Sequence, residues 1–234
     1  LHDDVETIMG HGLKAFGEMP ALVDGKLTWR LSPEEPSDDM ILRKVGNPFQ
    51  ANGGLAVFHG QLGEAVMKIS AVKPDHRFVE APAIVFEDQD DLLKAYKAGE
   101  LEKDFIAVIR FQGPKANGMP ELHKLTPSLG VLQDKGFKVA LVTDGRMSGA
   151  SGKVPSVIHV TPEAANGGPI ARVQDGDLIR IDADNGELTL LVDEKEFAGR
   201  TASTGPNNPE TFGRNLFAGM RALVGDAAKG ASVF

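Results

Sequence analysis

The 234-residue sequence contains no cysteine. Disulfides, thiolate zinc sites, a cysteine nucleophile and iron–sulfur ligation by thiolates of this chain are therefore excluded, because each needs a cysteine sulfur. The formal net charge is −8, whereas a surface that binds nucleic acid needs an excess of Lys and Arg. No apolar run approaches the roughly 20 residues that a membrane-spanning helix requires. We therefore expect neither a nucleic-acid partner nor a membrane partner.

Aromatic residues are scarce, at 6% of the chain, whereas 27 residues are Gly. This balance predicts an aliphatic core and many tight turns. Hydrophobic residues make up 41% of the chain, enough to fill the core of one large domain or of a domain with an extension. The sequence begins at Leu1, and its first residues lack the basic and apolar regions of a signal peptide. We therefore expect a piece of a longer, cytoplasmic protein.

Short apolar runs bounded by turn residues predict at least six strands. Beyond a connector over 17–54, in which Trp29 is the one large anchor, the predicted strands are LAVFHG (55–60), APAIVF (81–86), DFIAVIRF (104–111), FKVALVT (137–143), PSVIHVT, DLIRID and ELTLLV. The last two flank an Asn185-Gly186 pair, which is a strong hairpin signal. The pattern predicts a mixed β/α fold, with a β-barrel or sandwich flanked by helices.

Four helices are predicted from apolar spacing and from start and stop residues. One covers 3–13, and another begins after an Asp88 cap and ends before Gly99. A third begins at Pro120 and runs to about Leu132. The fourth covers 208–224 and places five apolar residues on one face, namely Phe212, Leu216, Phe217, Met220 and Leu223.

A glycine- and serine-rich loop, VTDGRMSGASGKVPS (142–156), follows one of the predicted strands. It differs from a nucleotide P-loop, which needs Gly at position 147 and Ser or Thr at position 154, where this chain has Met147 and Val154. Ser148 also lacks the G-x-S-x-G spacing of a hydrolase nucleophile. The residues alone leave two interpretations open: a structural turn, or a nest of backbone N–H groups that binds an anion.

A second Gly/Pro-rich loop, GPKANGMPELHK (113–124), leaves similar alternatives open. Glu121, placed in the first turn of a predicted helix, either compensates the helix dipole or binds a hard cation such as Mg²⁺. The nearby Lys115, His123 and Lys124 either contact an anionic substrate or are solvated. His159 is interpreted as a structural histidine, because no metal-ligand spacing surrounds it.

The two loops and their flanking segments resemble the C-terminal portion of the dihydroxy-acid/6-phosphogluconate dehydratase family. The resemblance extends from GPKANGMPELHKLTPSLGVL through LVTDGRMSGASGKVPSVIHVTPEAANGGPIARVQDGDLIRID to ELTLLVDE. GQLGEAVMKISAV and EAPAIVFED also fit this family. GASGKVPS favours the 6-phosphogluconate branch, as does ANG where the dihydroxy-acid enzymes usually carry a GGPG run.

The resemblance implies a swivelling β-barrel domain over 55–234, preceded by a linker helix and connector over 1–54. It implies a hydro-lyase that converts 6-phosphogluconate to 2-keto-3-deoxy-6-phosphogluconate, a step of the Entner–Doudoroff pathway. The implied cofactors are a 4Fe-4S iron–sulfur cluster and a divalent cation such as Mg²⁺. Because the chain has no cysteine, the cluster ligands would lie in the enzyme's own N-terminal domain, absent from this sequence. The full-length form is expected to be a homodimer, and this chain alone is expected to be inactive.

The same resemblance assigns roles to individual residues. Ser148 falls on the serine of the family's D-G-R-x-S-G motif, the proposed base that removes the C2 proton, and Glu121 falls on its G-M-P-E glutamate, a cation ligand. The expected substrate contacts are Arg146, Gly149, Ser151, Lys153, Lys115 and His123. Two alternatives stay open: the corresponding domain of a dihydroxy-acid or sugar-acid dehydratase, and a non-catalytic module for anion binding or dimerisation.

Overall fold

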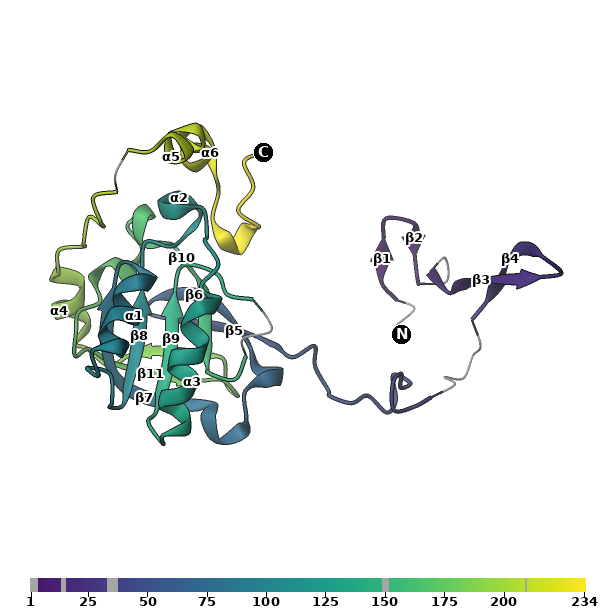
Figure 1. The fold of residues 1–234 in the computed structure, drawn as a ribbon, viewed down its shortest axis with the longest axis horizontal. Helices are drawn as coiled ribbons and strands as arrows, with labels where there is room; N and C mark the ends of the chain where they lie inside the picture. The colour runs from purple at the N-terminus through teal and green to yellow at the C-terminus, as the bar shows by residue number, and fades with distance from the viewer. Residues whose placement is uncertain (1–3, 14–15, 33–37, 149–151, 209) are drawn as a thin grey trace. The chain divides into compact units, whose positions relative to one another are not determined.

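The computed structural model describes residues 4–13, 16–32, 38–148, 152–208 and 210–234 (Figure 1). The chain divides into two compact units, 1–53 and 54–234. Among the described residues, no helix is both long enough and apolar enough to cross a membrane.

The first unit consists of two β-hairpins. Strands β1 (Glu6–Thr7) and β2 (Gly10–His11) pair, as do β3 (Glu18–Val23) and β4 (Lys26–Leu31). The helix predicted over 3–13 is therefore wrong. Gly10, at φ 107°, and the bond from the Thr7 hydroxyl to the Gly10 carbonyl (2.7 Å) close a tight turn instead. Trp29 is not a buried anchor either, because 62% of its surface is exposed.

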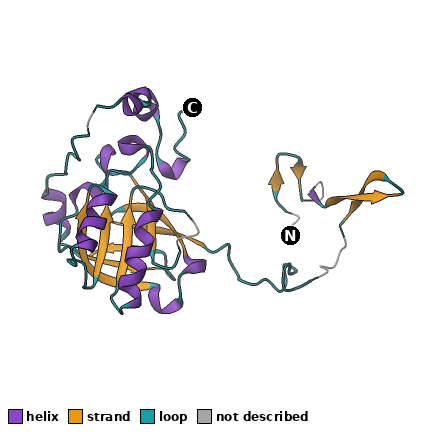
Figure 2. Ribbon diagram, viewed as in Figure 1, coloured by secondary structure: helices purple, strands orange, loops and turns teal. Residues whose placement is uncertain are grey.

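The second unit contains a closed barrel of eight strands, which confirms the predicted mixed β/α fold and selects a barrel over a sandwich (Figure 2). Around the barrel the strand order is β10-β6-β5-β12-β11-β7-β8-β9. Their bounds are β5 (Leu55–Gly60), β6 (Gly63–Lys68), β7 (Phe78–Phe86), β8 (Phe105–Ile109), β9 (Val139–Thr143), β10 (Ser156–Thr161), β11 (Leu178–Asp182) and β12 (Glu187–Leu190). The predicted hairpin at Asn185-Gly186 is confirmed, since β11 and β12 are antiparallel neighbours.

Strands β7, β8, β9 and β10 form a parallel segment of the barrel. β8 and β9 are buried on both faces, as their unbroken aliphatic runs predict. On β8, Ile106 and Val108 point into the barrel, while Phe105, Ala107 and Ile109 join an outer cluster. Helices α1 (Gln89–Lys97) and α3 (Thr126–Asp134) cover this outer cluster (Figure 1).

The helix predicted after Asp88 is confirmed as α1. The Asp88 side chain accepts a hydrogen bond from the Asp90 N–H (2.7 Å), and Gly99 follows the helix at φ 76°. The helix predicted from Pro120 starts later, since α3 begins at Thr126 after a 3₁₀ turn. Glu121 is therefore not in a first helical turn; its backbone forms a bridge with residue 146 instead.

The helix predicted over 208–224 consists of two short helices, α5 (Phe212–Leu216) and α6 (Ala218–Leu223). The five apolar residues of the predicted face are more than half exposed. Two further helices were not predicted, α2 (Pro114–Asn117) and α4 (Glu194–Gly199). The described 3₁₀ turns are η2 (Ile69–Ala71), η3 (Pro74–His76), η4 (His123–Leu125), η6 (Ala164–Asn166), η7 (Pro169–Arg172) and η8 (Ala227–Lys229).

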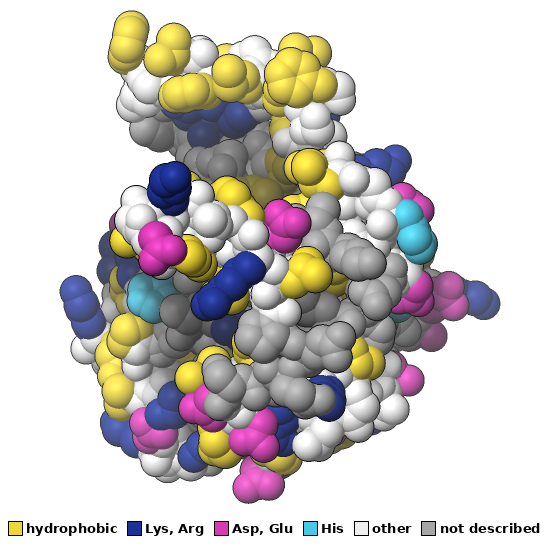
Figure 3. Space-filling view, turned by 90° about the vertical axis from the view of Figure 1, so that its right-hand side faces the viewer, with side chains coloured by type: hydrophobic (Ala, Val, Ile, Leu, Met, Phe, Trp, Pro, Cys, Tyr) yellow, Lys and Arg dark blue, Asp and Glu magenta, His cyan; other side chains and the backbone are white. Residues whose placement is uncertain are grey.

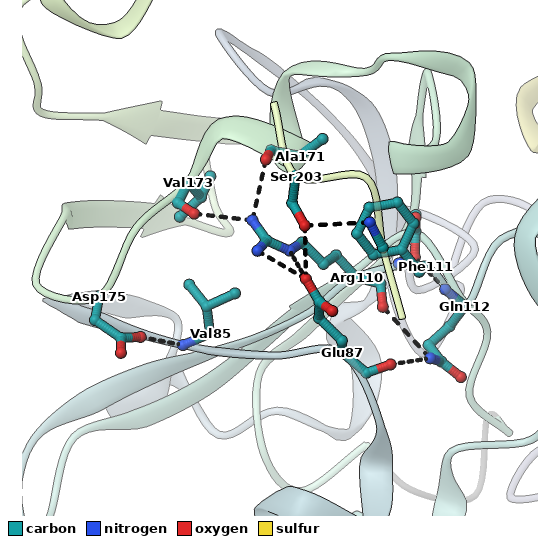
Figure 4. Close-up of polar contacts among 11 residues, drawn as sticks. Val85, Glu87, Arg110, Phe111, Gln112, Ala171, Val173, Asp175 and Ser203 are labelled. Carbon is teal, nitrogen blue, oxygen red and sulfur yellow. Dashed lines mark hydrogen bonds and ion pairs between the residues drawn. The ribbon is translucent and has the colours of Figure 1, made fainter. Parts of the chain in front are cut away.

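An ion pair at the ends of β7 and β8 ties the barrel to two later segments (Figure 4). Arg110 donates from Nη2 to Glu87 Oε1 (3.0 Å) and from Nη1 to the carbonyls of Ala171 (3.1 Å) and Val173 (3.0 Å). The Ser203 hydroxyl donates to the same Glu87 oxygen (2.7 Å). The segment after α4 is thereby held against the barrel, and the chain continues from it to the C-terminal helices.

Candidate functional site

The two sequence loops emerge side by side. GPKANGMPELHK follows β8 and DGRMS follows β9, and these strands are parallel neighbours. Because carboxyl ends of adjacent parallel strands meet at one edge of a sheet, both loops lie at the same end of the barrel. This is the usual position for functional loops in such sheets.

A buried aspartate, Asp144, holds the start of the DGRMS loop. Its Oδ2 accepts hydrogen bonds from the N–H groups of Phe111 (3.1 Å) and Ala164 (3.0 Å), and its Oδ1 accepts from Gln112 N–H (2.8 Å). Burial raises the pKa of Asp144 to about 6, although the three N–H donors counteract the rise. Sequence reasoning assigned no role to Asp144; its position directly after a fully buried strand is the signal that could have found it.

A second buried acid, Glu163, holds the other loop. It is 3% exposed, and its two oxygens accept from the N–H groups of Lys115 (2.8 Å) and Ala116 (3.0 Å) at the start of α2. A Cβ at Gly113 would lie 2.3 Å from Glu163 Oε2, so only glycine allows this approach. The two loops are therefore positioned by buried carboxylates.

Glu121 lies at the meeting point of the two loops. Its Oε1 accepts hydrogen bonds from the backbone N–H groups of Ser148 (2.8 Å) and His123 (3.0 Å), and its Oε2 accepts from Arg146 Nη1 (2.7 Å). The Arg146 Nε donates in turn to the carbonyl of Met119 (2.8 Å). The structure thus brings four of the predicted site residues together, two from each loop.

A hollow of about 230 Å³ borders Ser148. His159 also borders it and is half-buried, with a left-handed backbone at φ 59°. Burial and the neighbouring Arg146 lower the pKa of His159, which favours the neutral ring. Other described residues around the hollow are Leu55, Val66, Met67, Lys68, Met147, Gly152, Val154, Ser156 and Ile158.

The remaining predicted substrate contacts have other partners or lie outside the described residues. Lys153 Nζ lies 2.6 Å from both carboxylate oxygens of Asp134, at the end of α3. Lys115 Nζ donates to Asn166 Oδ1 (2.9 Å). The side-chain partners of Lys115 and Lys153 are therefore Asn166 and Asp134, and not Glu121. Gly149 and Ser151 lie outside the described residues, as does the central part of the proposed anion nest.

The donor set at this edge fits a divalent cation only in part. Among the residues that the structure describes, no three His, Asp or Glu side chains converge as a metal site. Mg²⁺ usually takes one or two protein carboxylates and keeps several waters, so the partly exposed Glu121 fits one such ligand, in competition with Arg146. An iron–sulfur cluster does not fit, because the chain has no thiolate to offer.

Residues 40–231 match the family described as Dihydroxy-acid/6-phosphogluconate dehydratase C-terminal. The chain belongs to this family. It is 58% identical over 235 residues to the phosphogluconate dehydratase of Pseudomonas aeruginosa PAO1, covering 100% of this chain and 39% of that protein. It is 52% identical over 238 residues to the phosphogluconate dehydratase of Escherichia coli K12, covering 99% and 39%.

A more distant relative is the dihydroxy-acid dehydratase of Ignicoccus hospitalis, which is 45% identical over 204 residues, covering 83% of this chain and 37% of that protein. The chain therefore spans about two fifths of the length of the curated relatives that it matches. Glu121 and Ser148, the residues to which the resemblance assigns roles, are joined by a hydrogen bond in this structure.

Proposed function

We propose that this chain is the C-terminal part of a phosphogluconate dehydratase, a hydro-lyase that removes water from 6-phosphogluconate. The relatives named phosphogluconate dehydratase, at 52% and 58% identity, support this substrate. The observation that carries the proposal is the 2.8 Å bond from the Ser148 N–H to Glu121, which joins the two motif residues in one site.

In the proposed reaction, Ser148 acts as the base. Its deprotonated Oγ takes the proton from C2 of the substrate, the C2 electron pair forms a C2–C3 double bond, and the C3 hydroxyl leaves with a proton as water. The resulting enol tautomerises to the 2-keto-3-deoxy acid. A neutral serine hydroxyl is too weak a base, so the alkoxide needs positive potential nearby. In this chain the Arg146 guanidinium and the N–H groups of His123 and Ser148 all bond to Glu121, so the proposed source is the divalent cation that Glu121 would hold.

The proposal includes a divalent cation such as Mg²⁺ and a 4Fe-4S cluster. Glu121 would be this chain's ligand to the cation. A bound cation supplies Lewis acidity toward the substrate's carboxylate and hydroxyl oxygens. The cluster ligands would come from the rest of the enzyme, because this chain contains no cysteine.

The proposal also makes 55–234 a swivelling domain, with 1–54 as its linker, in a homodimeric enzyme. The main support is an exposed apolar surface on α5 and α6, where hydrophobic side chains gather in Figure 3. Phe212 is 86% exposed and Leu223 is 74% exposed. Exposed apolar side chains that gather on one surface are typical of an interaction site. The enzyme's own N-terminal domain is the proposed occupant.

Kinetics of the full-length, cluster-loaded enzyme test the proposal. We expect it to dehydrate 6-phosphogluconate, and Ser148→Ala to lower kcat by about 10²- to 10⁴-fold, the range for loss of a general base. Ser70→Ala, an exposed serine on η2, is the matched control and should leave kcat unchanged. Retention of wild-type kcat in Ser148→Ala would contradict the assigned role.

The Ignicoccus relative supports a second candidate substrate, a 2,3-dihydroxy acid without phosphate. Comparing kcat/KM for 6-phosphogluconate, a dihydroxy acid and an unphosphorylated sugar acid on the same enzyme separates the candidates. If none is turned over but calorimetry detects binding of 6-phosphogluconate, the chain would instead belong to a binding module.

A further inference from the structure

A second and larger cavity, of about 600 Å³, lies between the loop after β8 and the C-terminal segment. Three of the described residues that line it are arginines, Arg146, Arg214 and Arg221, and none is acidic. This is unusual in a chain with a net charge of −8.

Arg214 and Arg221 are held in place by neutral groups. Arg214 donates from Nη1 to Asn117 Oδ1 (3.3 Å) and from Nη2 to the Ala116 carbonyl (3.0 Å). Arg221 Nη2 donates to the carbonyl of Arg214 (2.8 Å). Within the described part of the chain, neither guanidinium forms an ion pair with a carboxylate.

This arrangement has an electrostatic cost. Burial and the nearby like charge of Arg221 lower the pKa of Arg214. An anion between them would remove this repulsion. Phe217 and Met220 contribute apolar surface to the cavity wall, although both side chains are about half exposed.

Arg146 connects the cavity to the candidate site. It lines the cavity, and its Nη1 also contacts Glu121 Oε2 at 2.7 Å. A ligand with an anionic group at each end could therefore reach from the Glu121–Ser148 cluster into the arginine cavity.

We propose that this cavity binds the phosphate group of a phosphorylated sugar acid, with Arg214 and Arg221 as its principal contacts. The proposal rests on the proposed function and adds the residues that select the phosphate. Guanidinium groups suit this ligand, because their planar N–H pairs match two phosphate oxygens at once. Lys115 and Lys153, which were expected from the sequence to be substrate contacts, instead contact Asn166 and Asp134.

The test uses the full-length, cluster-loaded enzyme with Arg221→Gln and Arg214→Gln. We expect each variant to raise KM for 6-phosphogluconate about 10- to 100-fold, since each removes a charge-assisted hydrogen bond. Arg221→Lys keeps the charge without the planar fork and should fall between wild type and Arg221→Gln. The matched control is Lys229→Gln, an exposed cation of the same C-terminal segment, outside the cavity lining, which should leave KM unchanged.

Calorimetry with inorganic phosphate and with gluconate provides a second readout that needs no turnover. Wild type should bind phosphate, both glutamine variants should lose this binding, and gluconate binding should be the same in all three. A folding defect would instead weaken both ligands together and lower the melting temperature of the variant.

The outcomes separate this inference from the proposed function. If wild type dehydrates 6-phosphogluconate and both glutamine variants keep its KM, the cavity assignment is wrong and the proposed function stands. If wild type does not turn over 6-phosphogluconate, the proposed function fails, and phosphate binding that depends on Arg214 and Arg221 would still support the cavity. Absence of phosphate binding by wild type would overturn the inference.

Discussion

At the residue scale, the candidate site depends on carboxylates with different surroundings. Asp144 is fully buried and accepts three backbone N–H bonds from two other segments. Glu121 is partly exposed and contacts Arg146 and two backbone N–H groups. The first carboxylate fits a structural role and the second a chemical role, so their substitution should have opposite consequences for stability and activity.

We predict that Asp144→Ala destabilises the barrel unit by about 3 kcal/mol, since it leaves three buried N–H groups without an acceptor and each carries a substantial desolvation penalty. Chemical denaturation followed by far-UV circular dichroism measures the change. A loss below about 0.5 kcal/mol, the scale of a neutral surface substitution, would show that these bonds do not hold the loop.

The pH dependence of this contribution has a definite sign. The pKa of Asp144 is raised by burial to about 6, from 3.8. Between these values the native state binds more protons than the unfolded state, so the free energy of unfolding falls as pH rises through this window. We predict that wild type loses up to about 3 kcal/mol relative to Asp144→Asn between pH 4 and pH 7. Parallel stability profiles of the two proteins would contradict this.

For Glu121→Gln we predict the reverse combination. The ion pair to Arg146 is partly exposed, and such pairs contribute about 0–1 kcal/mol, so the melting temperature should hardly change. Under the proposed role of Glu121 as a cation ligand, activity of the full-length enzyme should fall by about 10²-fold. Circular dichroism and steady-state kinetics on one preparation measure both. Unchanged activity would remove Glu121 from the site.

At the element scale, closure of the barrel depends on the short parallel contact between β5 and β12. A Cβ at Gly60 would lie 1.6 Å from the Leu188 carbonyl oxygen, so β5 can approach β12 only with glycine there. We predict that Gly60→Ala destabilises the barrel by about 1–3 kcal/mol, as expected for forced overpacking.

Gly199→Ala is the matched control, because a Cβ at this end of α4 would meet no atom within 4 Å. Denaturation midpoints of the two variants give the comparison. Equal midpoints would show that the strands can separate at Gly60 without cost.

Seven strands of the barrel were predicted from the sequence, whereas β6, the hairpin strands β1–β4 and several helices were not. Aliphatic runs such as 104–111 are rich in β-branched residues and shorter than a typical helix, so they favour buried strands. The spacing in 3–13 also suits a helix, but a positive φ at Gly10 and the Thr7 bond produce a hairpin. In 208–224 the predicted apolar residues do lie in helices, but the segment forms two short helices in place of one.

The candidate site was predictable to a similar degree. Glu121, Arg146 and Ser148 are carried by local motifs, and the structure joins them. Asp144 and Glu163 act through backbone groups far away in the chain. Arg214 and Arg221 line one cavity with Arg146 only because the C-terminal segment packs against α2. Such contacts depend on tertiary structure, which local patterns do not encode.

At the scale of the whole molecule, the chain consists of two units with different spectroscopic properties. Trp29 is the single tryptophan; it lies in the 1–53 unit and is 62% exposed. We predict that unfolding of the barrel unit in this chain gives a cooperative circular dichroism transition with little change in tryptophan emission. A large shift in tryptophan emission that coincides with the barrel transition would contradict the exposed environment of Trp29.

The central claim is that Glu121 and Ser148 act as one unit across the two loops. A double-mutant cycle in the full-length enzyme tests it most directly, with kcat/KM for 6-phosphogluconate measured in Ser148→Ala, Glu121→Gln and the combined variant. Residues that act as a unit lose their effect together, so we predict that the double variant is about as impaired as the more damaged single variant. Full additivity of the two losses would contradict the claim.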